Sequence, residues 1–288
     1  MNVLKSIFIS NYIMLAMGIS GYAGWMLYQG ADPMAWGGVL LTTGPIVLVI
    51  SRLMMFQNAP RTSAHFPVLG VLGVIGTALT VWAWVNNPTG ILAPTFATIG
   101  LVGFLLYAYW FSTFGRKPST KIKVGAQLPK FVVKNVEGAV VSSAELTEGR
   151  AILMFYRGNW CPLCMAQVKE LAKRYQDISA LGVRVALISP QPHRNTISLA
   201  KKFGVNFDFL TDKGNTAART LGIGNPNGLP MGMQMMGYDS ETVLPTVIIT
   251  DETGKVVWTD ETDNYRVRPE PDVYLAVLRE NHLVGEAA

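Results

Sequence analysis

The sequence predicts two parts of different kinds: an α-helical membrane bundle of four transmembrane helices, then an α/β domain with a mixed central sheet. Four apolar stretches of about twenty residues occupy the first 118 residues, which is the length that crosses a bilayer. The chain has 24 Lys and Arg and 19 Asp and Glu, and only six of these lie in residues 1–118. Residues 119–288 alternate strand-like and helix-like patterns. We therefore expect two domains, 1–118 and 119–288.

The four apolar stretches lack the polar face that a soluble core helix shows every turn. The first is too long for the apolar region of a signal peptide, so it also counts as a span. Small residues recur within them at a spacing of three, which suits close helix contact, although glycine is common in membrane helices generally. The stretches are Ile7–Tyr28, Trp36–Phe56, Phe66–Val85 and Ile91–Phe114, and the glycines are Gly18, Gly21, Gly24, Gly70, Gly73 and Gly76.

Positive charge in the first part gathers on one side of the four predicted spans. The loop at 29–35 carries only Asp32, whereas the other side carries Lys5, Arg52, Arg61, Arg116 and Lys117. The positive-inside rule then predicts a multi-pass protein of the bacterial inner membrane, with both termini and the second domain in the cytoplasm. A miscounted span would reverse this orientation.

The predicted spans contain no cysteine and no charge deep inside the bilayer. The one histidine of residues 1–118, His65, lies at a loop edge. Thiol relay needs cysteines within the membrane, haem needs axial ligands such as a histidine pair, and ion transport usually needs buried ionisable residues. We expect the bundle to act as an anchor or docking element in contact with membrane lipid.

The second part reads as a β-α-β unit followed by a hairpin and a helix, which implies a mixed sheet with helices on both faces. Its cations exceed its acids by one, so it offers no basic surface to nucleic acid. The expected strands are 151–156, 183–188, 207–210, 246–250 and 256–259, and the expected helices are 162–181, 193–203, 216–221 and 272–281.

The only two cysteines of the chain form a C-x-x-C motif at the turn from the first strand into the first helix. Cys161 falls at the helix N-terminus, where free backbone N–H groups and the helix dipole favour a thiolate. Cys164 lies one turn further on the same face, within reach of a disulfide. The three histidines, His65, His193 and His282, are isolated in the sequence, so no zinc set assembles. We expect a redox-active pair that needs no metal and no cofactor.

The motif and its surroundings resemble a known family. Residues 155–164, Phe-Tyr-Arg-Gly-Asn-Trp-Cys-Pro-Leu-Cys, are similar to the signature of the thioredoxin-fold alkyl hydroperoxide reductase and thiol-specific antioxidant family, most of all its peroxiredoxin-like branch. Further matches are residues 124–131, 187–190 and 265–271, so the resemblance covers about Lys123 to Leu283 and none of the apolar part. It implies a thioredoxin-like second domain.

The resemblance leaves the roles of the two cysteines open. In typical peroxiredoxins the peroxide-reactive cysteine takes the later position, here Cys164. In thioredoxin-type enzymes the earlier cysteine attacks, here Cys161. Physical reasoning favours Cys161 for attack on disulfides, since it is expected nearer to solvent and to the helix terminus. For peroxide the two assignments remain equal.

Four other features are expected near the pair. Arg157 is a candidate to stabilise the thiolate, or else a solvated strand-end arginine. Trp160 is expected to shield the sulfurs. The resemblance implies that Pro245 is a cis-proline facing the cysteines, and the alternative is an ordinary trans proline at the start of a strand. Arg266 and Arg268 are expected in a surface charge run, with a place along the same edge as the pair as the alternative. A methionine-rich loop at 222–238 is expected to form an apolar lip of the site rather than a copper site.

These features favour a membrane-anchored thiol-disulfide oxidoreductase or peroxidase that reduces hydroperoxides or protein disulfides, with thioredoxin or another thiol as reductant. Two alternatives stay open. One is an extracytoplasmic thioredoxin-like disulfide reductase for exported proteins, for example in cytochrome maturation. The other is a non-enzymatic membrane redox sensor.

Overall fold

The computed structural model describes residues 2–55, 62–88 and 90–281. These residues divide into two compact units, Val3–Thr113 and Phe114–Ala288. Arg61, Phe56 and His282, which entered the sequence analysis, lie outside the described residues. Each unit is described separately below.

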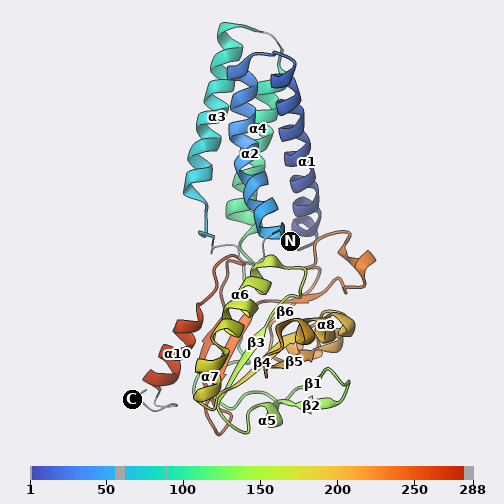
Figure 1. Cartoon of the computed structure of the whole chain (residues 1–288), viewed down its shortest axis with the longest axis vertical. Helices are drawn as coiled ribbons and strands as arrows, with labels where there is room; N and C mark the ends of the chain where they lie inside the picture. Colours follow the sequence, from blue (N-terminus) through green and yellow to red (C-terminus); the bar gives the residue numbers. More distant parts are fainter. Residues whose placement is uncertain (1, 56–61, 89, 282–288) are drawn as a thin grey trace. The chain divides into compact units, whose positions relative to one another are not determined.

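The first unit is a bundle of four helices, each long and apolar enough to cross a membrane. The last helix, α4, continues without a break into a wider π-helical turn, η1 (Figure 1). The helices are α1 (Asn2–Tyr28), α2 (Pro33–Met55), α3 (Pro67–Asn86) and α4 (Leu92–Leu105) with η1 (Leu106–Phe111).

Only part of the glycine pattern makes close helix contacts. A Cβ on Gly76 of α3 would lie 2.5 Å from the carbonyl oxygen of Gly38 on α2, so these two helices approach backbone to backbone. Thr80 reinforces the contact by donating to the carbonyl of Ala35 at 3.1 Å. The glycines of α1, in contrast, have nothing within 4 Å of an added Cβ. For Gly18, Gly21 and Gly24 the general abundance of glycine in membrane helices is the sufficient explanation.

The second unit is built on a seven-stranded mixed sheet with the order β2-β1-β5-β4-β3-β8-β9. Strands β3, β4 and β5 run parallel, and β8 pairs antiparallel with β3. The sheet strands are β1 (Val132–Lys134), β2 (Val140–Ser142), β3 (Ala151–Phe155), β4 (Arg184–Ser189), β5 (Asp208–Thr211), β8 (Thr246–Thr250) and β9 (Val256–Asp260). A separate short pair joins β6 (Gly224–Asn225) to β7 (Thr242–Val243).

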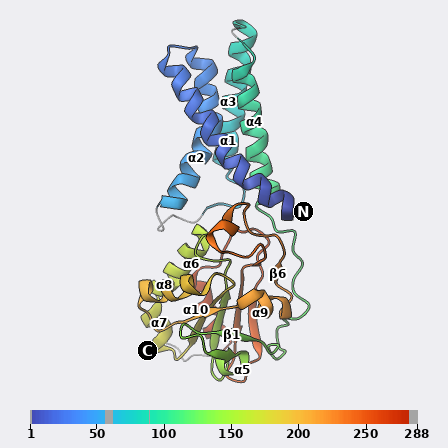
Figure 2. The same cartoon turned by 90° about the vertical axis from the view of Figure 1, so that its right-hand side faces the viewer.

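Helices cover both faces of this sheet, with α6 and α7 on one side and α9 on the other (Figure 2). Alternate residues of the parallel strands, such as Leu153 and Ile188, pack with α9 in one buried cluster. On the other side, Gln167 of α6 donates to the hydroxyl of Tyr274 in α10 at 2.8 Å. The helices are α5 (Ser143–Leu146), α6 (Pro162–Lys173), α7 (Tyr175–Ala180), α8 (His193–Phe203), α9 (Thr216–Thr220) and α10 (Pro271–Glu280), with short η2 (Lys213–Asn215) and η3 (Met233–Met236).

The predicted fold class is confirmed: four helices able to span a membrane, followed by a thioredoxin-like domain with a mixed central sheet. Two details differ from the expected elements. The helix expected over 162–181 breaks at Arg174 into α6 and α7. The edge hairpin β1–β2 was not expected, because its two strands have only three residues each and no continuous apolar run.

Candidate active site

Cys161 lies in the loop that leads from the end of β3 into α6. It occupies the N-cap position of α6 with extended backbone angles, and Pro162 takes the first helical position, where its missing N–H is not needed. Before it, Gly158 has a φ of 141°, and a Cβ there would lie 2.8 Å from the Trp160 ring. Only glycine fits this turn, which explains the glycine of the motif.

Cys161 and Cys164 are both reduced and both buried. Cys161 is 2% exposed and Cys164 is fully buried, so the expected difference in solvent access is small. Their acidities differ strongly. The hydrogen bond from the Cys164 side chain, helped by the charges of Arg157 and Arg268, lowers the pKa of Cys161 to about 6 in spite of its burial. The same hydrogen bond, with burial, raises the pKa of Cys164 well above its usual value. Cys161 is therefore the more acidic of the two thiols.

Arg157 is buried beside the pair, with 6% of its surface exposed, so it is not a solvated strand-end arginine. Its Nη2 donates to the carbonyl of Gly228 at 2.6 Å. Its guanidinium lies over the Trp160 ring at 4.5 Å from the centroid, and over the Phe114 ring at 5.9 Å. Its Nε has no hydrogen-bond partner among the described residues. The guanidinium is thus held by two aromatic rings and one carbonyl, and its Nε–H donor remains without an acceptor among the described residues.

Trp160 is half-buried between this arginine and the Gly158 turn. Its ring forms the cation–π contact with Arg157, which is stronger in a desolvated setting. Its indole N–H is buried without a partner among the described residues. Trp160 therefore packs against the buried arginine that lies beside the two cysteines.

Arg266 and Arg268 contradict the expected surface charge run, because both are buried, at 2% and 8% exposure. The charge of Arg268 lowers the pKa of Cys161. The sequence pattern misled here because a run of alternating charges looks the same on a solvated loop and on a loop that folds inward.

The expected cis bond at Pro245 is wrong: there is no cis peptide bond in the described residues, so the bond after Leu244 is trans. Pro245 is nevertheless buried at the start of β8, the strand next to β3. Its carbonyl accepts a hydrogen bond from Nη1 of Arg116 at 3.0 Å. The resemblance implied a cis bond before Pro245, and the structure has a trans bond there.

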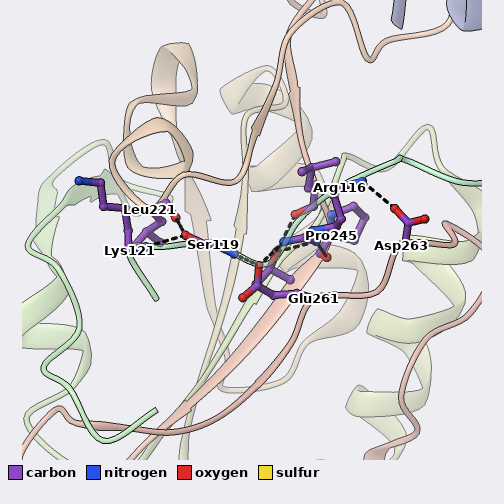
Figure 3. Close-up of polar contacts among 9 residues, drawn as sticks. Arg116, Ser119, Lys121, Leu221, Pro245, Glu261 and Asp263 are labelled. Atoms are coloured by element: carbon purple, nitrogen blue, oxygen red, sulfur yellow. Dashed lines mark hydrogen bonds and ion pairs between the residues drawn. The ribbon is translucent and has the colours of Figure 1, made fainter. Parts of the chain in front are cut away.

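Arg116, which the sequence analysis placed among the cations beside the predicted spans, contacts Pro245 and Glu261 (Figure 3). Its side chain is 3% exposed and forms an ion pair of 2.7 Å with Glu261, which is 7% exposed. The carboxylate of Glu261 also accepts from the backbone N–H of Ser119 at 2.7 Å. No signal in the sequence distinguishes this arginine from Lys117, because the difference lies in the partner, 145 residues away.

The methionine-rich loop borders the cysteine loop. Tyr238 donates to the Oδ1 of Asn159 at 2.5 Å, and Thr242 donates to the carbonyl of Arg157 at 3.2 Å. Met231, Met235 and Met236 are exposed, at 48%, 93% and 58%. No cluster of three or more His, Cys, Asp or Glu residues that could hold a metal ion occurs in the described ranges.

Residues 124–259 match the family model of the AhpC/TSA family. Residues 124–259 form an AhpC/TSA family domain. Its cysteine loop, helix α6 and strand β8 are the elements described above, whereas α10 lies beyond the matched segment.

The AhpC/TSA domain has relatives of two kinds. The chain is 26% identical over 159 residues to the thiol-disulfide oxidoreductase ResA of Bacillus thuringiensis (strain Al Hakam), covering 55% of this chain and 78% of the relative. It is 25% identical over 139 residues to a protein named as a peroxiredoxin from Mycobacterium tuberculosis (strain CDC 1551 / Oshkosh), covering 48% and 85%.

A solved structure of similar fold is peroxidoxin BcpB from M. tuberculosis, with a TM-score of 0.47 and 21% identity over 55% of this chain and 97% of that chain. By its family match and its two relatives in sequence, the AhpC/TSA domain is a thiol-dependent oxidoreductase, and the family implies a thiol reductant and a peroxide or disulfide substrate.

Proposed function

We propose that this chain is a membrane-anchored thiol-disulfide oxidoreductase in which Cys161 attacks and Cys164 resolves. The observation that carries the proposal is the opposite shift of two neighbouring thiols: one pKa falls to about 6 while the other rises. A thiol of low pKa is mostly thiolate at neutral pH, and the thiolate is the nucleophile. The second thiol stays protonated until it is needed.

The reaction follows from this division. The Cys161 thiolate attacks one sulfur of a substrate disulfide, forms a mixed disulfide and releases the other substrate sulfur as a thiolate. Cys164 then loses its proton to that leaving thiolate and attacks the Cys161 sulfur. The Cys161–Cys164 disulfide forms, and two electrons have passed to the substrate, which leaves with one thiol and one thiolate that takes a proton from water. A thiol reductant, thioredoxin or another small thiol, returns the pair to the dithiol.

Cysteine variants of the full chain in detergent test the assignment. Cys164→Ser should trap a mixed disulfide on Cys161, because the resolving thiol is absent. Cys161→Ser should form little adduct at neutral pH, since the burial of Cys164 still raises its pKa when the Cys161 thiol is absent. Mass spectrometry after incubation with a protein disulfide detects the adduct, or its absence, in both variants. Adducts on Cys164 in Cys161→Ser, together with no adduct on Cys161 in Cys164→Ser, would show that Cys164 attacks and Cys161 resolves.

Hydrogen peroxide or a lipid hydroperoxide is a second candidate substrate, supported by two guanidinium groups whose charges act on Cys161. The thiolate would attack the distal oxygen, release water or an alcohol, and become a sulfenic acid. Cys164 would then condense with it, lose water and give the same disulfide. Parallel turnover assays with peroxide, lipid hydroperoxide and protein disulfide decide between the substrates, and no turnover of any would favour a redox sensor.

We propose that the four helices of the first unit hold the enzyme in the inner membrane with its redox domain in the cytoplasm. The charge pattern of the loops supports this, since Asp32 lies between α1 and α2, and Lys5 and Arg52 lie at the opposite ends of these helices. In intact cells, a membrane-impermeant maleimide should leave Cys161 and Cys164 of this chain unlabelled. After permeabilisation it should label them. Equal labelling in both would indicate the extracytoplasmic reductase instead.

A further inference from the structure

A cavity of about 350 Å³ opens beside the cysteine loop in the second unit. Strands β3, β4 and β5 are parallel, so the loops that follow them meet at one edge of the sheet. Cys161 follows β3, while the cavity is lined by residues that follow β4 and β5. In open α/β sheets, the carboxyl edge of the strands is the usual place for a ligand.

The wall of this cavity carries an excess of positive charge. Lys134 and Lys213 line it, and neither has an ion-pair partner among the residues that the structure describes. His193 also lines it, with Nδ1 at 3.0 Å from the hydroxyl of Thr211. One acid, Asp239, lies on the same wall. Two uncompensated cations and one carboxylate are complementary to a ligand with two carboxylates and one ammonium.

The size of the cavity excludes the simplest anions as its full occupant. Since a water molecule takes about 30 Å³ in the liquid, the cavity has the volume of about ten waters. Inorganic phosphate would fill only part of it. An amino acid or short peptide has the size, the two kinds of charge and the flexibility to reach both lysines and Asp239.

A hydrogen-bond network joins this cavity to the cysteine loop through Gln191, which is 2% exposed. Its Oε1 accepts from the backbone N–H of Asn159 at 2.8 Å, two residues before Cys161. Its Nε2 donates to the hydroxyl of Tyr156 at 3.1 Å, and to Thr196 at 3.2 Å. A ligand in the cavity therefore contacts the residue that holds the cysteine loop.

We propose that this cavity binds a small amino-acid-like or peptide-like molecule that carries two carboxylates and one ammonium group. Lys134 and Lys213 take the carboxylates, and Asp239 takes the ammonium. The site belongs to the same sheet edge as the dithiol, so it gives the enzyme a means to recognise a small charged thiol or disulfide. Binding itself does not require the cysteines to turn over, and it is tested separately from the proposed function.

Isothermal titration of the full chain in detergent with S-methylglutathione tests the proposal. This probe has two carboxylates and one ammonium but no free thiol, so it reports binding without redox chemistry. The double variant Lys134→Gln, Lys213→Gln should bind at least about tenfold more weakly, because two charge-assisted hydrogen bonds are lost. The matched control Lys130→Gln, Lys173→Gln removes two exposed lysines that do not line the cavity and should bind as the unmodified chain does.

Two further probes separate the charge requirement from nonspecific binding. The diethyl ester of S-methylglutathione, which lacks both carboxylate charges, should bind far more weakly than the parent. Inorganic phosphate should not compete at equal concentration. Equal binding by the two double variants, equal binding of the ester, or effective competition by phosphate would each overturn the proposal. Unchanged melting temperatures of the variants establish that they are folded.

Discussion

At the scale of single residues, the acidity of Cys161 is the property on which the chemistry depends. The pKa near 6 has contributions from one hydrogen bond, two arginines and the start of a helix, all working against burial. Because this pKa lies below neutrality, the rate of alkylation of Cys161 should rise as pH increases through about 6 and level off above it.

The arginine contribution can be measured directly. Arg157→Met should raise the apparent pKa of Cys161 by about one unit, which corresponds to about 1.4 kcal/mol. Alkylation at pH 6 should then slow, while the plateau rate above pH 8 should stay similar. The control is Arg150→Met, which removes a partly exposed arginine paired with Glu252 and should leave the profile unchanged. An identical profile for Arg157→Met would assign this arginine to packing alone.

The Gly158 turn gives a second prediction at this scale. Gly158→Ala should lower the free energy of unfolding by about 1–3 kcal/mol, since it combines a positive φ with a clash against the Trp160 ring. Gly138→Ala has the same backbone problem, with φ of 87°, but nothing within 4 Å of the new Cβ. In denaturant titrations, Gly158→Ala should therefore lose more unfolding free energy than Gly138→Ala. Equal losses would show that the Trp160 ring moves aside without an energetic penalty.

At the scale of elements, helices α2 and α3 are in contact where Gly38 and Gly76 approach most closely. Gly38→Val should force these helices apart and lower the thermal stability of the bundle in detergent. Its neighbour Gly37 has nothing within 4 Å, so Gly37→Val should have little effect. A similar loss from both variants would mean that β-branching in the helix, not the contact, is responsible.

The elements also show what could be predicted from the sequence. Long apolar runs such as β3 and β8 and the four helices were predictable, because burial on all sides leaves a continuous apolar pattern. The cysteines and Arg157 were found because they are close in sequence. Arg268, Arg116 and the trans bond at Pro245 were not, since each depends on contacts between distant segments. The cavity beside the site was missed for the same reason: its lysines come from β1 and η2, 79 residues apart.

At the scale of the whole molecule, the segment that begins at Phe114, shortly after η1, belongs to the redox unit. Phe114 lies under the guanidinium of Arg157, and Arg116 is bound to Pro245 and Glu261. A fragment that begins at Ser119, the domain boundary expected from the sequence, lacks both residues. It leaves Glu261 buried without its cation, and a broken buried ion pair costs about 3–5 kcal/mol.

A stability comparison of two fragments, beginning at residue 114 and at residue 119, tests these two domain boundaries. Residues 114–288 should fold and unfold cooperatively in denaturant, with a higher midpoint than residues 119–288. In the shorter fragment, Glu261→Gln should recover part of the loss, because the uncompensated charge is removed. Equal midpoints for the two fragments would indicate that the Arg116 ion pair adds nothing to stability. The same comparison tests whether the domain starts at 119.

The position of Phe114 and Arg116 limits how this enzyme could be transplanted. A designer who joined the redox unit to another anchor at Ser119 would discard an aromatic ring that contacts Arg157 and a cation that binds Pro245 and Glu261. The exchangeable module, for protein engineering or for gene fusion in evolution, therefore begins at Phe114, directly after the last residue of the bundle.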